Sequence, residues 1–162
     1  MYQWVLWLHV SSILGFVLFH GVSAVAVFRL RGEQSPERAK ALLQLSTYPA
    51  NLAWISLGVL LVTGIALGFL GHWWSWGWIW VSIGVLVAVI VGMSLLGSKS
   101  MNIIRGRLGM PTSYGEAPDP SLAFEHPGQL SEHLARLPIW PLSGLGFGGL
   151  LVIVWLMMFK PF

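Results

Sequence analysis

Two histidines, His9 and His20, are the residues whose type and position could support chemistry inside a membrane. They are the only ionisable side chains within the four long apolar segments of the chain, since every Lys, Arg, Asp and Glu lies outside them. A charge at mid-bilayer costs at least about 2.5–3.5 kcal/mol, so ionisable residues there are rare and are functional candidates by default. Histidine is the mildest case, because its imidazole can be neutral near pH 7.

Each of these histidines could ligate a tetrapyrrole, but they cannot share one haem. They are eleven residues apart, which places them within about 20° of one helix face and about 16 Å apart along the axis. Axial ligands must approach one iron from opposite sides, whereas each histidine could ligate a separate haem b or chlorin. His72 is expected near the same side of the membrane as His9, so it is the expected second ligand for His9. Only His126 and His133 could reach the level of His20, and only if their loop folds back.

Hydrogen bonding within the protein is the alternative role for both histidines. Val5 and Phe16 stand four residues before them, where pigment-binding helices of light-harvesting proteins often have a small residue. No other apolar segment offers a second intramembrane histidine, as a four-helix dihaem cytochrome would need. The sequence leaves both roles open.

The composition is that of a membrane protein. The chain is 56% hydrophobic and 9% charged, against about 25% charged in a typical soluble domain. The absence of cysteine excludes disulfides, iron–sulfur clusters and thiolate metal sites. The basic residues are dispersed, so the net charge of +3 does not indicate nucleic-acid binding.

The apolar segments predict membrane-spanning helices over residues 4–28, 51–70, 78–97 and 139–159. Each has the roughly 20 residues that cross about 30 Å of hydrocarbon. Backbone groups in lipid must be bonded within the segment, which requires helices. We expect a single all-α domain over residues 1–162, a four-transmembrane-helix bundle.

Basic residues in two connecting segments predict the orientation. They are Arg29, Arg31, Arg38 and Lys40 after the first span, and Lys99, Arg105, Arg107 and Arg136 after the third. Positively charged loops stay in the cytoplasm. Both termini are therefore expected outside, in a multi-pass protein of a bacterial inner membrane.

The two cytoplasmic segments have some predicted structure of their own. Ser35 followed by Pro36 predicts a helix start, with the helix reaching about residue 45 and a break at Pro49. The long loop 98–138 is expected to be irregular over 109–128 and helical over 129–137. Long loops of this kind are usually functional or bound to a partner.

Small residues at intervals of four predict close helix packing. They are Gly64 and Gly68 in the second span, Gly84, Ala88 and Gly92 in the third, and Gly144 and Gly148 in the fourth. The pattern leaves open whether these stripes face the bundle or another subunit.

Five tryptophans surround the turn between the second and third spans: Trp73, Trp74, Trp76, Trp78 and Trp80. Indole prefers the headgroup region, so an interfacial anchor for a tight hairpin is one interpretation. Exposed tryptophan is also a favoured contact residue, so a docking surface for another membrane subunit or a pigment is the other.

Transport and copper handling have little support in the sequence. Ion-coupled transporters usually carry charged residues within the membrane, and this chain has none there. Copper would require clustered soft ligands. The candidates Met93, Met101, Met110, Met157 and Met158 do not form a convincing set.

The stretch from Tyr2 through His9 to Gly15, closed by Phe28 and Arg29, resembles uncharacterised bacterial four-helix integral membrane proteins. These are loosely similar to the copper-resistance CopD type and to HemJ-type protoporphyrinogen oxidases. The resemblance implies a four-span plan, with His9 at the position of a first-helix histidine implicated in haem binding. The HemJ type also uses an intramembrane lysine, whereas Lys99 here lies past the third span, which argues against that oxidase activity.

We therefore expect a non-catalytic accessory or scaffolding subunit of a larger membrane complex, with a photosynthetic or respiratory host. Its expected partners are the lipid bilayer and other membrane subunits. The alternative is a haem b- or chlorin-binding protein that uses His9, His72 and His20 for electron transfer or pigment binding. No catalytic constellation or protein-ligated metal site is predicted.

Overall fold

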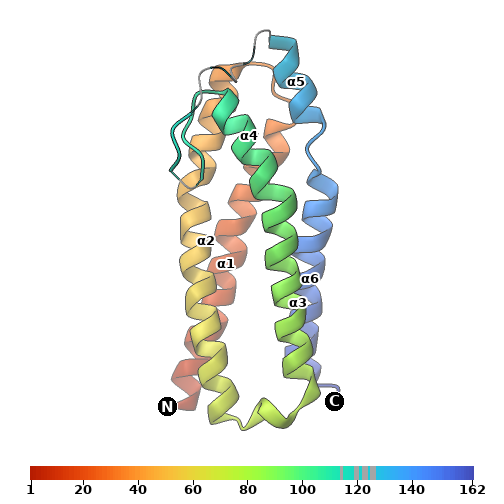
Figure 1. The fold of residues 1–162 in the computed structure, drawn as a ribbon. Helices are drawn as coiled ribbons and strands as arrows, with labels where there is room; N and C mark the ends of the chain where they lie inside the picture. The colour runs from red at the N-terminus through yellow and green to blue at the C-terminus, as the bar shows by residue number, and fades with distance from the viewer. Residues whose placement is uncertain (114, 119–120, 122–123, 125–126) are drawn as a thin grey trace.

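Four long helices run side by side in the computed structural model, which describes residues 1–113, 115–118, 121, 124 and 127–162. They are α1 (Tyr2–Leu30), α2 (Pro36–Leu70), the continuous helix that starts with α3 (Gly77–Met93), and α6 (Ile139–Phe159) (Figure 1). All four are long and apolar enough to cross a membrane. Among the described residues no strand occurs, so the predicted all-α four-helix membrane fold is confirmed.

Both termini lie at one end of the bundle, together with the turn between α2 and α3 (Figure 1). We call this the terminal end. The basic connecting segments and the short helix α5 (Pro127–Ala135) lie at the opposite end, the cap end. The arrangement agrees with a chain that crosses a bilayer four times, with the terminal end outside in the predicted orientation.

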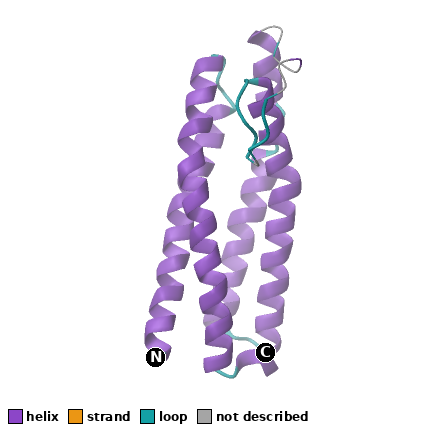
Figure 2. Ribbon diagram, turned by 60° about the vertical axis from the view of Figure 1, so that its left-hand side comes forward, coloured by secondary structure: helices purple, strands orange, loops and turns teal. Residues whose placement is uncertain are grey.

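The helices are arranged as two pairs. α1 packs along α2, and α3 packs along α6, whereas α1 meets α6 over only a short stretch. The separation of the pairs is visible from two directions (Figures 1 and 2). The pairs are therefore joined mainly at their ends.

The predicted break at Pro49 is wrong, because α2 continues through it as one helix of 35 residues. Proline removes one backbone N–H from the helix and crowds the preceding turn. Hydroxyl groups support that turn: Ser46 Oγ and Thr47 Oγ1 donate to the carbonyl of Leu43, and Ser23 Oγ of α1 donates to the carbonyl of Ser46. The predicted N-cap is present, since Ser35 Oγ accepts from the backbone N–H of Arg38.

The third span also extends further than predicted. After Met93 the chain forms a π-helical segment, η2 (Ser94–Ser98), and continues as α4 (Lys99–Arg107). The predicted loop 98–138 therefore starts with a helix, and its predicted short helix is α5, two residues earlier than expected. α2 alone is about 52 Å long, against about 30 Å of hydrocarbon, so the helices project beyond the bilayer at the cap end.

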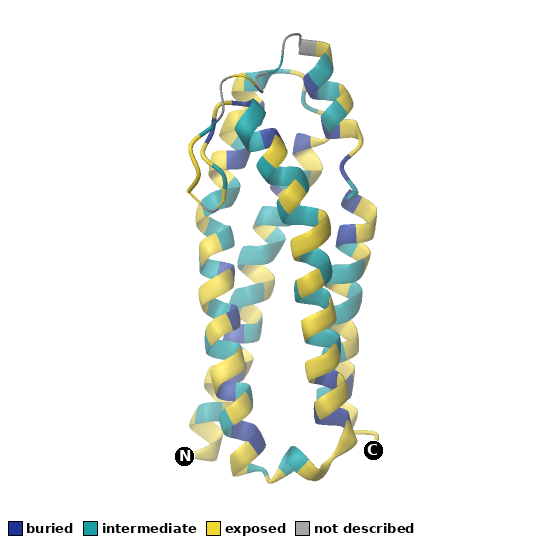
Figure 3. Ribbon diagram, viewed as in Figure 1, coloured by how far each residue is buried: buried dark blue, intermediate teal, exposed yellow. Residues whose placement is uncertain are grey.

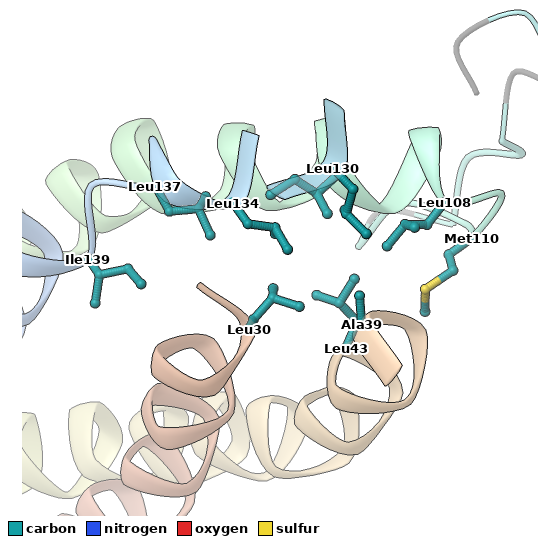
Figure 4. Packing of buried hydrophobic residues seen from close by; sticks show 10 residues of the cluster. Leu30, Ala39, Leu43, Leu108, Met110, Leu130, Leu134, Leu137 and Ile139 are labelled. Carbon is teal, nitrogen blue, oxygen red and sulfur yellow. The ribbon is translucent and has the colours of Figure 1, made fainter. Parts of the chain in front are cut away.

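The best-packed part of the protein is this projecting cap. Its buried core comprises Leu30, Ala39, Leu43, Ile104, Leu108, Met110, Leu130, Leu134, Leu137 and Ile139. Figure 4 shows Leu130 and Leu134 of α5 pointing toward Leu30 and Ala39, across the gap between the two pairs. The cap thus joins both helix pairs through burial of apolar side chains.

Away from the cap, large apolar side chains are exposed along the helices (Figure 3). Examples are Leu18, which is 63% exposed, Val62 at 69% and Leu151 at 69%. Contiguous apolar surface of this extent is unfavourable in water and is the surface expected of spanning helices.

Candidate functional site

His9 connects α1 to α2 by hydrogen bonds inside the membrane. Its side chain is buried, and Nδ1 lies 2.9 Å from Thr63 Oγ1 and 3.1 Å from the carbonyl oxygen of Leu60. A polar group in lipid is costly without such partners, which explains why the ring points into the helix pair.

The hydrogen bonds also define which ring nitrogen of His9 carries the proton. The Thr63 hydroxyl donates to backbone carbonyls of its own helix, at 2.7 Å from Val59 and 3.1 Å from Leu60, and the Leu60 carbonyl beside Nδ1 can only accept. We therefore assign the proton of the neutral ring to Nδ1 and the lone pair to Nε2. A histidine that ligates a metal through Nε2 uses Nδ1 in the same way.

Glycine makes room for the His9 ring on α2. A Cβ at Gly64 would lie 3.2 Å from Cε1 of His9. One of the residues predicted to serve helix packing thus does so between α1 and α2, directly at the histidine.

The structure does not bring His9 and His72 together. His72 follows the end of α2 in the left-handed conformation, with φ 54°, and is exposed. It stands eight residues beyond Gly64, which contacts His9, and this corresponds to about 12 Å along the helix axis. The two residues therefore lie at different depths along the bundle, and their shared ligation of a haem remains a prediction from the sequence.

His20 lies where the two helix pairs approach each other. Its ring stacks on Phe16 of the same helix, with centroids 5.2 Å apart and planes 7° apart, and meets Phe147 of α6 edge-on at 6.4 Å. Nε2 lies 3.8 Å from where a Cβ of Gly146 would be, as does Sδ of Met93. Within the described part of the chain, His20 has no hydrogen-bond partner.

His133 does not reach His20. His133 lies in α5, where Nδ1 donates to the carbonyl of Gln129 at 3.0 Å and the ring contacts Phe124. This position is in the cap, not in the bundle. His126 lies outside the described residues.

The predicted glycine stripes divide into covered and uncovered positions. Gly68 faces the Trp74 ring, and a Cβ at Gly92 would lie 2.5 Å from Leu145 Cδ2. A Cβ at Gly84, Gly144 or Gly148 would meet nothing within 4 Å, and Ala88 is exposed. On α6, Gly149 is the glycine that contacts Val89 of α3. Gly144 and Gly148 therefore do not face α3, which is one of the two orientations that the sequence left open.

Of the five turn tryptophans, Trp78 is buried and Trp73 and Trp74 are partly buried against other parts of the protein. Trp78 is 2% exposed and forms a core with Ile79 and Leu156. Trp73 contacts Trp78, with centroids 5.5 Å apart, and Lys160 Nζ lies 4.2 Å from the centroid of its ring.

Trp74 lies over Gly68 and Phe69 at the end of α2, and its buried Nε1 has no hydrogen-bond partner in the part of the chain that the structure describes. Trp76 is 51% exposed and Trp80 58%. Trp80 also packs on Trp74, with centroids 5.7 Å apart, and its Nε1 donates to the Trp74 carbonyl. Trp73, Trp74 and Trp78 thus fit the hairpin-anchor interpretation, while the exposed parts of Trp76 and Trp80 can make external contacts.

Sequence reasoning missed the approach of Met93 to His20. The methionines do not suggest a metal site as a group, because the relevant partner of Met93 is a histidine on another helix. The signal in the sequence was weak, since only the depths of the two residues in their spans could have suggested it. Among the described residues, no group of three or more His, Asp or Glu could hold a metal ion.

No protein family, curated protein or solved structure matches this chain. The likeness to the CopD and HemJ types thus remains a prediction from the first helix.

Proposed function

We propose that the protein is a non-catalytic accessory or scaffolding subunit of a larger membrane complex. The observation that supports this most is the uncovered small-residue surface of α3 and α6, comprising Gly84, Ala88, Gly144 and Gly148. In membranes, such surfaces allow the close approach of another helix. Because no helix among the described residues covers them, a helix of another subunit is the occupant that we propose.

Two further features support the same proposal. Trp76 and Trp80 are exposed at the terminal end, close to the α3 part of this surface. At the cap end the helices project beyond the bilayer, which provides a second surface for contact with a partner. A photosynthetic or respiratory host remains a prediction from the sequence.

Native electrophoresis of gently solubilised membranes tests this function. The protein is expected to migrate in a defined complex, and the double substitution Gly84→Leu with Ala88→Leu is expected to release it. Val87→Leu on the same helix is the matched control, because Val87 is already large and 53% exposed. A stable solitary monomer in mild detergent would contradict the proposal.

A second candidate function is haem b or chlorin binding, and it is favoured by the geometry of His9. Donation from Nδ1 leaves the Nε2 lone pair of a buried ring unused by any hydrogen bond of the described residues. An absorption spectrum of the purified protein tests this candidate. A Soret or chlorin band that disappears in His9→Ala would support it, and the absence of any such band would remove it.

A further inference from the structure

His20 of α1 and Met93 of α3 come together beside Gly146 of α6. Here α1 contacts α6 through His20 and Phe147, and it contacts α6 again nearer the cap through Phe28 and Trp140. His20 Nε2 and Met93 Sδ are each 3.8 Å from the same point, the position that a Cβ of Gly146 would occupy. The two atoms are therefore no further apart than twice that distance. Three helices converge here, and the residue between the two donors has no side chain.

The surroundings leave His20 without an alternative partner. Phe16 covers one face of the ring and Phe147 contacts its edge, and neither can accept a hydrogen bond from a ring nitrogen in the ordinary way. Lipid offers no water to replace such a partner. His9 shows the contrast, because it satisfies Nδ1 on α2 at 2.9 Å and 3.1 Å.

Met93 reaches this point at an irregularity of its helix. It is the last residue of α3, and the π-helical segment Ser94–Ser98 follows directly. A π-helical turn shifts the side chains that follow onto another face, and such turns occur often at functional sites. Here the shift allows α3 to pack on α6 while Ile104 of α4 packs in the cap core with Leu43 of α2.

We propose that His20 Nε2 and Met93 Sδ form a donor pair for a soft, low-charge metal centre held between the two helix pairs. An imidazole nitrogen with a thioether sulfur binds the iron of haem and suits copper(I). Both donors are neutral, and no carboxylate lies within the predicted spans, so a hard or highly charged cation would be poorly compensated there. If the metal centre is haem iron, this proposal rests on the second candidate function, haem binding, and extends it to His20 and Met93.

Titration of the purified protein with two probes tests whether His20 and Met93 bind a metal centre, and it distinguishes haem iron from copper(I). One arm adds haemin and follows the Soret band, and the other adds copper(I) in competition with a chromophoric chelator. One of the two is expected to bind with one-to-one stoichiometry. His20→Ala and Met93→Leu are each expected to weaken that binding at least tenfold, whereas Met158→Leu, at a methionine that is 73% exposed, is expected to leave it unchanged.

Substitutions at Gly146 provide a second, steric test in which both donors, His20 and Met93, are retained. A Cβ there would be in ordinary contact with them at 3.8 Å, so Gly146→Ala should bind the metal centre normally. Gly146→Leu places a larger group between the donors and should abolish binding while the helical circular dichroism is retained.

Three results would overturn the proposal: no binding of either probe, undiminished binding in His20→Ala, or undiminished binding in Met93→Leu. A haem band lost only in His9→Ala would overturn it while leaving the second candidate function intact. These measurements use the isolated protein, so they do not depend on whether it assembles with other subunits.

Discussion

The Nδ1 atom of His9 lies 2.9 Å from the hydroxyl oxygen of Thr63, 54 residues away in the sequence. This hydrogen bond joins α1 to α2 at a depth where lipid supplies no competing partner. It also orients the imidazole, so that Nδ1 is the donor and Nε2 carries the lone pair.

Removing the acceptor should weaken the pair of helices by a modest amount. Thr63→Val keeps the shape of the side chain, and hydrogen bonds between membrane helices are worth on average about 0.6 kcal/mol and up to about 1.7 kcal/mol. We expect a coupling free energy in this range from a double-mutant cycle of Thr63→Val with His9→Phe, measured by unfolding in mixed micelles. A coupling of zero would show that the hydrogen bond contributes nothing to the stability of the protein.

Two adjacent glycines of α6 should respond in opposite ways to alanine. A Cβ at Gly149 would overlap Cγ2 of Val89, whose branched side chain has little rotamer freedom in a helix. Gly149→Ala is therefore expected to destabilise the protein by about 1–3 kcal/mol, the usual cost of overpacking. Gly148→Ala meets nothing within 4 Å and should be neutral or slightly stabilising. Equal effects in unfolding experiments on the isolated protein would contradict this register of α3 on α6.

The cap should carry a large share of the connection between the helix pairs. Leu134 is fully buried there, and truncation of a buried leucine costs about 2–5 kcal/mol. Leu134→Ala is expected to lower the unfolding midpoint and to loosen the connection between the two helix pairs. Cross-linking of α1 to α6 at the cap end measures the second effect. Leu151→Ala, at a leucine that is 69% exposed, should have little effect on either measurement.

Glu33, in the turn between α1 and α2, should titrate below its ordinary range. The backbone N–H groups of Ser35 and Gln34 donate to its carboxylate, each at 3.0 Å, and lower its pKa. A folded-state pKa below the unfolded value stabilises the protein above the unfolded pKa, and this contribution disappears as the pH falls through the folded pKa.

An NMR titration of the Glu33 carboxyl carbon measures the shift, and Glu33→Gln should abolish the acid-side change of the Ser35 amide resonance. A titration midpoint at or above that of a free glutamate would contradict the geometry of this turn.

The histidines show how much of the candidate site could be predicted from the sequence. Their isolation within apolar segments identified them as the polar groups of the first span, and the alternatives of ligand or hydrogen-bonding group were both open. Depth matching on the sequence could not show that His9 has hydrogen-bond partners on α2. Nor could it show that His20 has only aromatic ring contacts and no hydrogen bond among the described residues. Side-chain partners between helices depend on the rotation of each helix about its axis, which the apolar composition of these spans barely constrains.

The glycines and Pro49 make the same point. Small residues at intervals of four predicted close packing but left open which of them face the bundle, and on α6 it is Gly149 that contacts Val89. Pro49 read alone predicts a break, whereas the helix continues because hydroxyl groups and cap packing support the turn before it.

The sequence by itself determined the number of spans, their helical nature and the predicted orientation. These follow from the cost of placing charges and unpaired backbone groups in hydrocarbon, which depends on residue type and segment length alone. Only the tertiary structure decided that the four helices form two pairs joined by a cap, that Trp78 of the tryptophan turn is buried, and that Met93 lies near His20 beside Gly146. Those outcomes depend on close packing between residues far apart in the chain, where one residue of register decides which side chains meet.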